Sequence, residues 1–500
     1  MYFAFALLTG IVVYYSLMAN NLVNNIDGIW HPSNFIAGDW EISLGRGLQR
    51  YADRARFGLV SNPWNSILVF ALFGITDCFI IKKFRMEKTF FSFLFVFITI
   101  ANPIMGESLS YSYMSVNFAC AYLFSVLAFY YISDDCSEIK RVIMGMVISS
   151  VCFAISMAFY QAYICVYAVL CVFLLILKFK KNENTKEVIK TIGLCLFTFL
   201  TGGLLYLAIT KILLFRAGVQ MASYRGAENA GLLTIVKNLP QSIVGAYRET
   251  FGYFITGRLN ANLEFSGIMI LLVCLVLLMA SIGEIIGIIR EKKPQRIPII
   301  LLLAILPMAS SIICIIAPGN EISGLMAMGV LIGILLFFLL AEDKKYMRII
   351  MSIAYVVMAW YLVSAVENDQ IALREGMVAT RNMAENALSE MYSEDLLSEV
   401  RCVAFVGRTA ENPLFYKSTA YEMANGYAQF GRWSTDPRNN MVTWIGITET
   451  MCGASVPICG VDTYSEIVYT DVVSRMPIYP TKGYMKVIDD VLVVKMSNLY

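Results

Sequence analysis

The sequence predicts an α-helical polytopic membrane protein that ends in a small α/β domain. Of its 500 residues, 58% are hydrophobic and only 15% are charged, whereas ordinary soluble domains carry roughly 25% charged residues. The mean hydropathy is +0.65. Apolar runs close to the length of about 20 residues that crosses a hydrocarbon core recur as far as residue 366, and charges become frequent only after it.

Composition excludes several classes of function. The formal net charge of +2 is too small and too dispersed to indicate a nucleic-acid partner. The single histidine, His31, excludes a multi-histidine metal site within one chain. The 12 cysteines form no CxxC pair, so neither zinc-ribbon nor thioredoxin-type chemistry is indicated.

About eleven apolar segments are candidate membrane spans. They lie at 2–19, 65–81, 89–101, 111–132, 142–159, 162–177, 191–214, 265–289, 297–316, 324–340 and 349–366. The first has neither the basic start nor the cleavage site of a signal peptide, so we interpret it as an uncleaved span.

Lysines and arginines in short loops indicate the orientation, because such loops stay in the cytoplasm. Basic loops follow the second, fourth, sixth, eighth and tenth spans, all on one side of an eleven-span chain. This agreement supports the span count and an amino terminus inside the cell. We therefore expect three segments outside, namely the loops 20–64 and 215–264 and the tail 367–500.

These boundaries divide the chain into a transmembrane domain at 1–366 and an extracytoplasmic α/β domain at 367–500. In the tail we expect a polar-faced helix over 369–400, a strand over 402–406 and a closing hairpin of strands 485–488 and 492–495. Cys452 and Cys459 lie in this tail, where a disulfide between them and two free thiols are both open alternatives.

Charged residues within spans usually indicate an ion or proton pathway. Here Asp77, Lys211 and Glu284 all fall toward span ends, which disfavours a proton-coupled transporter. Charges gather instead in the loop 20–64, interleaved with tryptophans and tyrosines.

The candidate catalytic residues of that loop are Asp27 and Asp39. An acid just beyond the first span is placed to act as a general base on a lipid-linked substrate whose reactive bond lies at headgroup depth. The alternative for Asp27 is a helix cap or turn residue. Arg46 is a candidate phosphate ligand, because a guanidinium binds phosphate oxygens bidentately. The later arginines of the loop are better explained by anionic lipid headgroups.

Glu107 lies in a predicted external turn at 102–111. It is either a second carboxylate that faces Asp27 across a cavity or a solvated turn residue. As a second carboxylate it would orient the base or help to hold a divalent cation such as Mg²⁺ or Mn²⁺. No metal ligand set can be assigned from the sequence, so a metal cofactor stays an open alternative.

Four further candidates for binding a substrate lie at other span ends. Tyr160 and Gln161, between the fifth and sixth spans, suggest a sugar-facing or headgroup-facing position, although an interfacial aromatic belt explains the tyrosine alone. Arg225 and Arg248 lie in the loop 215–264, where apolar residues at helical spacing predict a helix lying on the bilayer. They are either phosphate ligands or lipid-facing basic residues.

Several of these stretches, taken in order, resemble the bacterial Gtr type-II glucosyltransferases, polytopic enzymes of the C-type (GT-C) glycosyltransferase class. The likeness rests on Asp27, Trp40 and the Gly45-Arg46 pair, and on four longer strings. These are NPIMGESLSYSY at 102–113, SMAFYQAYI at 156–164, FVG at 405–407 and YPTKGYMKVIDDVLVVKM at 479–496.

The resemblance implies transfer of a hexose, typically glucose, from a polyprenyl-phosphate carrier to a surface polysaccharide on the outer face of the bacterial cytoplasmic membrane. It implies Asp27 as the base, Glu107 as a supporting acid and Arg46 as a phosphate or structural ligand. The partners would be the lipid-linked donor, a surface glycan acceptor and the bilayer, with no nucleic acid.

Two other functions stay open from the residues alone. A polysaccharide polymerase or ligase would depend on loop arginines and not on Asp27. A transporter for lipid-linked sugars would need polar residues distributed through the spans, which this sequence does not favour.

Overall fold

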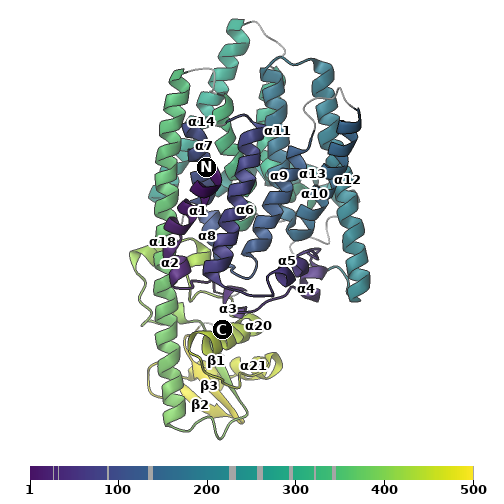
Figure 1. The fold of residues 1–500 in the computed structure, drawn as a ribbon. Coiled ribbons are helices and arrows are strands. Elements are labelled where there is room, and N and C mark those ends of the chain that lie inside the picture. The colour runs from purple at the N-terminus through teal and green to yellow at the C-terminus, as the bar shows by residue number, and fades with distance from the viewer. Residues whose placement is uncertain are drawn as a thin grey trace.

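The computed structural model describes residues 1–25, 27–31, 33–86, 89–132, 139–223, 232–255, 263–291, 297–319, 323–340 and 345–498. The chain is mostly helical, at 73%. Its helices form a bundle, and a small sheet lies at one end of it (Figure 1). The long helix α18 runs along the side of the bundle and continues beside the sheet.

The helices and strands have the following bounds. In the first half they are α1 (Tyr2–Val13), α2 (Tyr15–Ala19), α3 (Asp27–Trp30), α4 (Asp39–Ser43), α5 (Gln49–Ala55), α6 (Asn62–Lys83), α7 (Phe90–Ile100), α8 (Pro103–Ser110), α9 (Ser115–Tyr130), α10 (Ile139–Phe159), η1 (Gln161–Tyr163), α11 (Ile164–Lys180), α12 (Thr185–Ala217) and α13 (Leu232–Ile255). They continue with α14 (Leu263–Glu291), α15 (Ile297–Ser310), α16 (Ile313–Ile316), η4 (Gly324–Met326), α17 (Met328–Leu336), η5 (Phe337–Leu340) and α18 (Lys345–Ser393). The tail holds β1 (Cys402–Val406), η6 (Thr409–Glu411), α19 (Thr419–Met423), η7 (Gly426–Ala428), α20 (Pro437–Gly446), η8 (Ile447–Met451), α21 (Val461–Val468), α22 (Asp471–Arg475), β2 (Met485–Ile488) and β3 (Val491–Lys495).

Six helical segments of the described chain are long and apolar enough to cross a membrane. They are Asn62–Lys83, Phe90–Ser110, Ile139–Phe159, Gln161–Lys180, Thr185–Ala217 and Lys345–Ser393. Several shorter apolar helices, including α1, α9 and α15, accompany them. The structure is thus that of a helical protein suited to a membrane, and the count of about eleven spans stays a prediction.

Helix α6 shows how the sequence sets these elements. Pro63 stands in its first turn, where a missing N–H costs no hydrogen bond. Lys82 and Lys83 lie in its last turn, where positive charge is favourable beside the unpaired carbonyls. Its 22 residues extend about 33 Å, close to the thickness of a hydrocarbon core.

Asp77 lies inside this helix, where the sequence suggested a position toward a span end. It is fully buried, and its carboxylate accepts hydrogen bonds from Thr99 Oγ1 at 2.5 Å and Tyr122 Oη at 2.8 Å. Two donors from neighbouring helices therefore satisfy this acid, and they join α6 to α7 and α9.

The predicted turn at 102–111 is wrong, because most of this segment is helix α8. The Asn102 side chain accepts from the backbone N–H of Met105, and Pro103 occupies the first turn. Asn-Pro is as good a signal for the start of a helix as for a turn. Because an apolar span precedes Asn102, the sequence predicted a turn at Asn-Pro and not the start of a helix.

Helix α18 continues far beyond residue 366, where the sequence placed the end of the transmembrane domain. Its 49 residues extend about 74 Å, more than twice the hydrocarbon thickness. The helix predicted over 369–400 is therefore the second half of α18 rather than a separate element.

The predicted strands are confirmed in the tail. The sheet has the order β1-β3-β2, with β1 parallel and β2 antiparallel to β3. Asp489 and Asp490 both have positive φ, at 45° and 64°, as in a type I′ hairpin turn. Alternate residues of β1 face two cores: Phe405 stacks on Trp444 at 4.3 Å between ring centroids, while Ala404 packs in the cluster around α21.

Cys452 and Cys459, for which the sequence left both alternatives open, are not bonded to each other. Cys459 is bonded to Cys402, with 5.0 Å between their Cα atoms, and Cys452 is a free thiol. Val403 pairs with Ile458 in a parallel bridge, which brings the two bonded cysteines side by side. Sequence spacing carries no information about that pairing.

We expect Cys459→Ala to lower the free energy of unfolding of the tail by on the order of 4 kcal/mol, because the bond closes a loop with a sequence separation of 57. Cys452→Ala is the matched control and should change it by less than about 1 kcal/mol. Thermal unfolding of the whole protein in detergent measures both. Equal effects, or a peptide map under non-reducing conditions that links Cys452, would contradict the assignment.

Candidate functional site

The segment that carries Asp27 is held against the end of α8. The backbone N–H of Asn24 donates to Ser110 O at 3.2 Å, and the Asn24 side chain accepts from the N–H of Gly28 at 2.8 Å. A Cβ on Gly28 would lie 2.7 Å from Ser110 O, so only glycine permits this approach. Asn24 and Gly28, which precede and follow Asp27, are therefore fixed to the bundle.

The same segment is bonded to the tail. Asn25 Nδ2 donates to Gln429 O at 3.0 Å, and Asn25 Oδ1 accepts from the N–H of Gly431 at 2.6 Å. A Cβ on Gly446 would lie 2.9 Å from Ile29 O, so α20 packs closely on α3. Figure 1 shows α3 at this junction, between the bundle and the sheet. Asp27 therefore lies where the first loop, the bundle and the tail meet.

Tyr113 is the polar neighbour of Asp27. Its hydroxyl donates to Asp27 Oδ1 at 3.4 Å, and its ring lies 4.7 Å from that of His31 and 4.6 Å from that of Phe35. Burial raises the pKa of Tyr113 well above its ordinary value, and the charge of Asp27 raises it further. Tyr113 is thus held protonated as a hydrogen-bond donor. The charge of Arg46 lowers the pKa of the same tyrosine, and its effect is smaller than that of Asp27.

A buried ion pair contacts the backbone of Tyr113. Arg56 Nη2 lies 2.8 Å from Asp53 Oδ1 and also donates to Tyr113 O. Asn117 donates to the same Asp53 oxygen at 3.1 Å, and the N–H of Ala37 donates to the other at 2.9 Å. Asp53 is 0% exposed. The assignment of this arginine to lipid headgroups was therefore wrong, because it is part of the folded loop.

Asp39 and Arg50 form an ion pair of 3.2 Å at the surface, where the Asp39 side chain is 63% exposed. Such a pair contributes little to stability. The structure thus gives Asp39 an exposed position at the start of α4, and Arg50 a carboxylate partner instead of a lipid.

Arg46, Tyr160 and Gln161, predicted from distant parts of the chain, come together. Arg46 Cζ lies 4.7 Å above the Tyr160 ring, a cation–π contact. Gln161 Nε2 donates to Leu44 O at 2.7 Å and to Tyr206 Oη at 2.9 Å. Arg46 Nε is buried and has no hydrogen-bond partner within the described residues. A buried guanidinium N–H without a partner suits an anionic ligand.

Glu107 lies on α8, one turn before Ser110. A Cβ on Gly324 would collide with its carboxylate, so Glu107 packs against the start of η4. Its charge also acts on Tyr427, a tail residue whose hydroxyl donates to Asp369 Oδ2 at 2.7 Å. The described contacts therefore place Glu107 beside Gly324 and the tail and place Asp27 beside Tyr113.

The last two candidates lie apart from this group. Arg248 is on α13, with its side chain 72% exposed and its Nε 3.4 Å from Glu249 Oε1. Helix α13 packs against α15 and α16 in the bundle, with the Thr250 hydroxyl donating to Pro307 O at 2.9 Å. Helix α13 is therefore packed into the helical bundle, whereas the sequence predicted a helix lying on the bilayer. Arg225 lies outside the described residues.

Sequence reasoning missed three groups, namely Tyr113, the Asp53–Arg56 pair and Asp369. Asp369 is fully buried in α18 and accepts from the N–H and side chain of Asn425 at 2.9 and 2.8 Å. The available signal was an acid directly after an apolar run, the same signal that selected Asp27. In the parts of the chain that the structure describes, no three His, Cys, Asp or Glu residues are grouped to hold a metal ion. This search does not test a cation held by one or two carboxylates, so Mg²⁺ or Mn²⁺ stays a prediction.

Together, the apolar helical bundle and the polar cluster at its end fit a membrane protein with a candidate site where the bundle meets the tail. The chain belongs to the Glucosyl transferase GtrII family, whose model matches residues 15–325, more than half of its length. The match confirms the resemblance and covers Asp27, Arg46, Glu107, the Tyr160-Gln161 pair and Arg248. Comparison with curated proteins and with solved structures gave no significant match.

We expect His31 to stay neutral well below its ordinary pKa. Burial lowers that pKa from 6.5 to about 4, so the unfolded chain takes up a proton here before the folded one does. The stability that His31 contributes is present above pH 6.5 and is lost as the pH falls toward 4. Because His31 is the sole histidine, one imidazole NMR signal reports the titration. A midpoint near 6.5 would contradict the partly buried position of His31.

Proposed function

We propose that the protein transfers a hexose, with glucose favoured by its family, from a polyprenyl-phosphate carrier to a surface polysaccharide or related glycan. The reaction would take place on the outer face of the bacterial cytoplasmic membrane, by an enzyme of the GT-C class. The observation that carries this proposal is the cluster at the junction. There, Tyr113 is hydrogen-bonded to Asp27, and the partly unpartnered cation Arg46 stacks on Tyr160, within the segment that matches the family.

In this reaction Asp27 takes the proton of an acceptor hydroxyl as its oxygen forms a bond to the anomeric carbon. The bond from that carbon to the phosphate oxygen breaks, and its electron pair leaves with the phosphate. Attack from the face opposite the phosphate inverts the anomeric centre. The hydrogen bond from Tyr113 stabilises the ionised carboxylate and orients it.

Arg46 is assigned to the leaving group. Negative charge on the phosphate grows in the transition state, so a fixed cation stabilises that state more than the ground state. Stacking on Tyr160 holds the guanidinium in place. Its buried Nε–H group is available to donate a hydrogen bond to the phosphate. Gln161 holds the adjacent turn by donating to Leu44 O and Tyr206 Oη, and Tyr206 Oη lies so close to Gly45 that a Cβ there would collide with it.

Two observations support an outer location. The bond between Cys402 and Cys459 is of a kind that persists in oxidising compartments. Helix α6 begins at the first loop, where Asn62 donates to Leu22 O at 2.7 Å, and its far end carries Lys82 and Lys83. The basic loop and the junction therefore lie at opposite ends of a span, as the positive-inside tendency requires.

We expect Asp27→Asn to lower the rate of sugar transfer by about 10²- to 10⁴-fold, because the amide cannot accept the proton of the hydroxyl. Asp39→Asn, the same change in the same loop at an exposed pair, is the matched control and should retain activity. Each variant is expressed in a strain that lacks the gene, and mass spectrometry of the surface glycan measures the hexose added. Full activity of Asp27→Asn at normal expression would exclude it as the base and favour a polymerase or ligase.

We expect Arg46→Gln to reduce the turnover number by about 10²-fold with a smaller change in donor KM, since its contact strengthens in the transition state. Arg50→Gln is the control, because Arg50 already has an exposed carboxylate partner. Turnover of polyprenyl-phosphate glucose by purified protein measures both. A rise in KM alone would show that Arg46 only binds the donor.

A further inference from the structure

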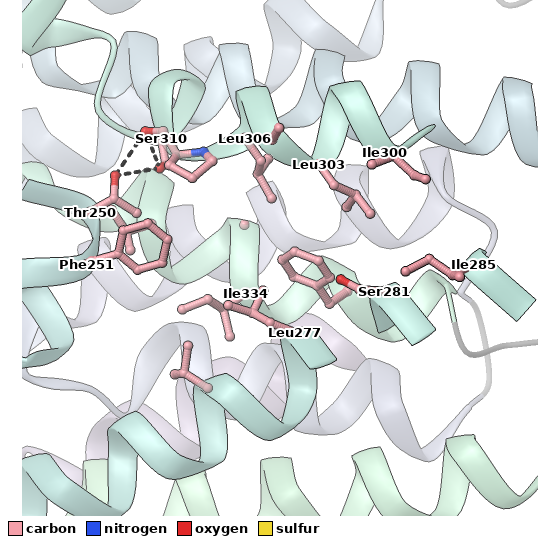
Figure 2. Close-up of a pocket in the computed structure, with 16 residues that line it drawn as sticks. Thr250, Phe251, Leu277, Ser281, Ile285, Ile300, Leu303, Leu306, Ser310 and Ile334 are labelled. Carbon is pink, nitrogen blue, oxygen red and sulfur yellow. Dashed lines mark hydrogen bonds between the residues drawn. The ribbon is translucent and has the colours of Figure 1, made fainter. Parts of the chain in front are cut away.

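Two cavities among the described helices differ in their chemistry. The cavity in Figure 2, of about 340 Å³, lies between α13, α14, α15 and α17 and is lined by apolar side chains such as Leu303, Leu306 and Ile334. The other, the basic cavity, has a volume of about 560 Å³ and lies where α6 and α9 end and α10 begins. None of its ten described lining residues is acidic, and four are basic, namely Lys82, Lys83, Arg85 and Arg141. The basic cavity therefore favours an anion.

Lys83 fixes one wall of the basic cavity. Its Nζ donates to Ile132 O at 2.7 Å and to Tyr130 O at 3.2 Å, at the C-terminal end of α9. The ammonium also lies 5.9 Å from the centre of the Tyr130 ring, a cation–π contact. A Cβ on Gly145 would lie 2.6 Å from Tyr131 O, so α10 packs closely on the same end of α9. Lys83 therefore holds α6 to α9, and the other three cations lie around this wall.

Arg85 occupies a backbone position that favours glycine. The N–H of Arg85 donates to Lys82 O at 3.2 Å, just beyond the end of α6. The N–H of Met86 donates to Ile81 O at 2.9 Å. These two bonds form a Schellman motif, whose left-handed residue is usually glycine. The φ of Arg85 is 57°, where a residue with a Cβ is strained. The turn alone does not explain an arginine here, and its side chain lines the basic cavity.

An exposed apolar strip continues from the basic cavity along α10. Met144 lines the cavity and is 63% exposed. Val147 and Val151 follow it with exposed fractions of 58% and 44%. Residues three and four apart share one face of a helix, so these three side chains form one strip. Because α10 is long and apolar enough to cross a membrane, hydrocarbon chains can lie along this strip.

The charge and the place of the basic cavity identify the class of ligand. Lysine and arginine bind phosphate oxygens, and the volume falls in the usual range for ligand sites. The cavity lies at the Lys82 end of α6, the end that the positive-inside tendency assigns to the cytoplasm. Basic pockets between helices at that side bind the headgroups of anionic phospholipids. Several cations around one cavity favour a headgroup with two phosphodiesters, as in cardiolipin.

We propose that the basic cavity binds the headgroup of an anionic phospholipid, with cardiolipin preferred to phosphatidylglycerol. Lys82, Arg85 and Arg141 contact the phosphates, and the acyl chains lie along the strip on α10. The site is at the opposite end of α6 from the loop that carries Asp27, so its ligand is a lipid that stabilises the bundle and not the sugar donor. This inference goes beyond the proposed function, because it needs α6 and α10 to cross a bilayer and needs no step of sugar transfer.

Acidic residues of the chain are the alternative partners of these cations. Asp134, Asp135 and Glu138 lie in the segment 133–138, outside the described residues. If these acids neutralise the cations, stability does not depend on the charge of the surrounding lipid. A lipid that binds the folded protein raises its stability. Anionic and zwitterionic bilayers therefore distinguish the two.

Native mass spectrometry of the full-length protein in detergent measures binding directly. We expect cardiolipin to bind more tightly than phosphatidylglycerol, and phosphatidylcholine to bind at least about tenfold more weakly than cardiolipin. Inorganic phosphate in excess should not displace the cardiolipin. Equal binding of phosphatidylcholine would overturn the proposal. Displacement by inorganic phosphate would show that the basic cavity binds a soluble anion and would overturn the assignment to a lipid.

Matched substitutions locate the site. Arg141→Gln removes a lining cation, and Lys140→Gln removes the neighbouring charge, which does not line the cavity. We expect about fivefold weaker cardiolipin binding for Arg141→Gln and no change for Lys140→Gln. Arg85→Gly removes another lining cation and relieves the left-handed strain. It should weaken cardiolipin binding by a similar factor, yet unfold at the same or a higher temperature in phosphatidylcholine nanodiscs.

Thermal unfolding in nanodiscs completes the test. The unmodified protein should unfold at a higher temperature in bilayers with cardiolipin than in phosphatidylcholine alone, and Arg85→Gly and Arg141→Gln should each reduce this difference. Equal cardiolipin binding by Arg141→Gln and Lys140→Gln would overturn the location of the site. Unfolding that does not depend on the lipid, with Arg141→Gln equally destabilising in both bilayers, would assign the cations to the acids of 133–138 and overturn the proposal.

Discussion

The structure depends on the hydrogen bonds that hold Asn24 and Asn25 between the helical bundle and the tail. On one side Asn24 is bonded to Ser110 at the end of α8, and on the other Asn25 is bonded to Gln429 and Gly431 of the tail. Each bond satisfies a polar group that is expensive to bury unpaired. The tail is therefore bonded to the loop that carries Asp27, even though the family match ends before the tail.

The buried charges near this junction are satisfied by neighbouring groups. Asp53 is paired with Arg56 and bonded to Asn117, and Asp369 accepts three hydrogen bonds from the tail. Removing one partner of such a group leaves the other uncompensated, which typically costs about 3–5 kcal/mol. These groups therefore fix the positions of Tyr113 and of the tail. Arg46 differs, because one of its buried N–H groups has no partner within the described chain.

Local sequence signals predicted the helical spans, β1 and the closing hairpin, because each is encoded by its own apolar pattern and turn residues. These local signals failed where the end of an element or the partner of a residue is set by tertiary contacts or by continuation of a helix. Polar composition after residue 366 did not end α18, since a helix needs no apolar residues to continue. Cys402 was not recognised as the partner of Cys459, and Tyr113 was not recognised as the partner of Asp27, because tertiary folding alone brings these pairs together.

The central claim is that the junction binds a lipid-linked sugar with its anomeric carbon between Asp27 and Arg46. A cryo-electron microscopy structure with a non-hydrolysable polyprenyl-phosphate sugar tests it most directly. The account requires the phosphate within hydrogen-bond distance of Arg46, and the Asp27 carboxylate on the opposite face of the sugar, with room for a hydroxyl between them. A sugar bound away from the first loop, or on the side of Lys82 and Lys83, would contradict it.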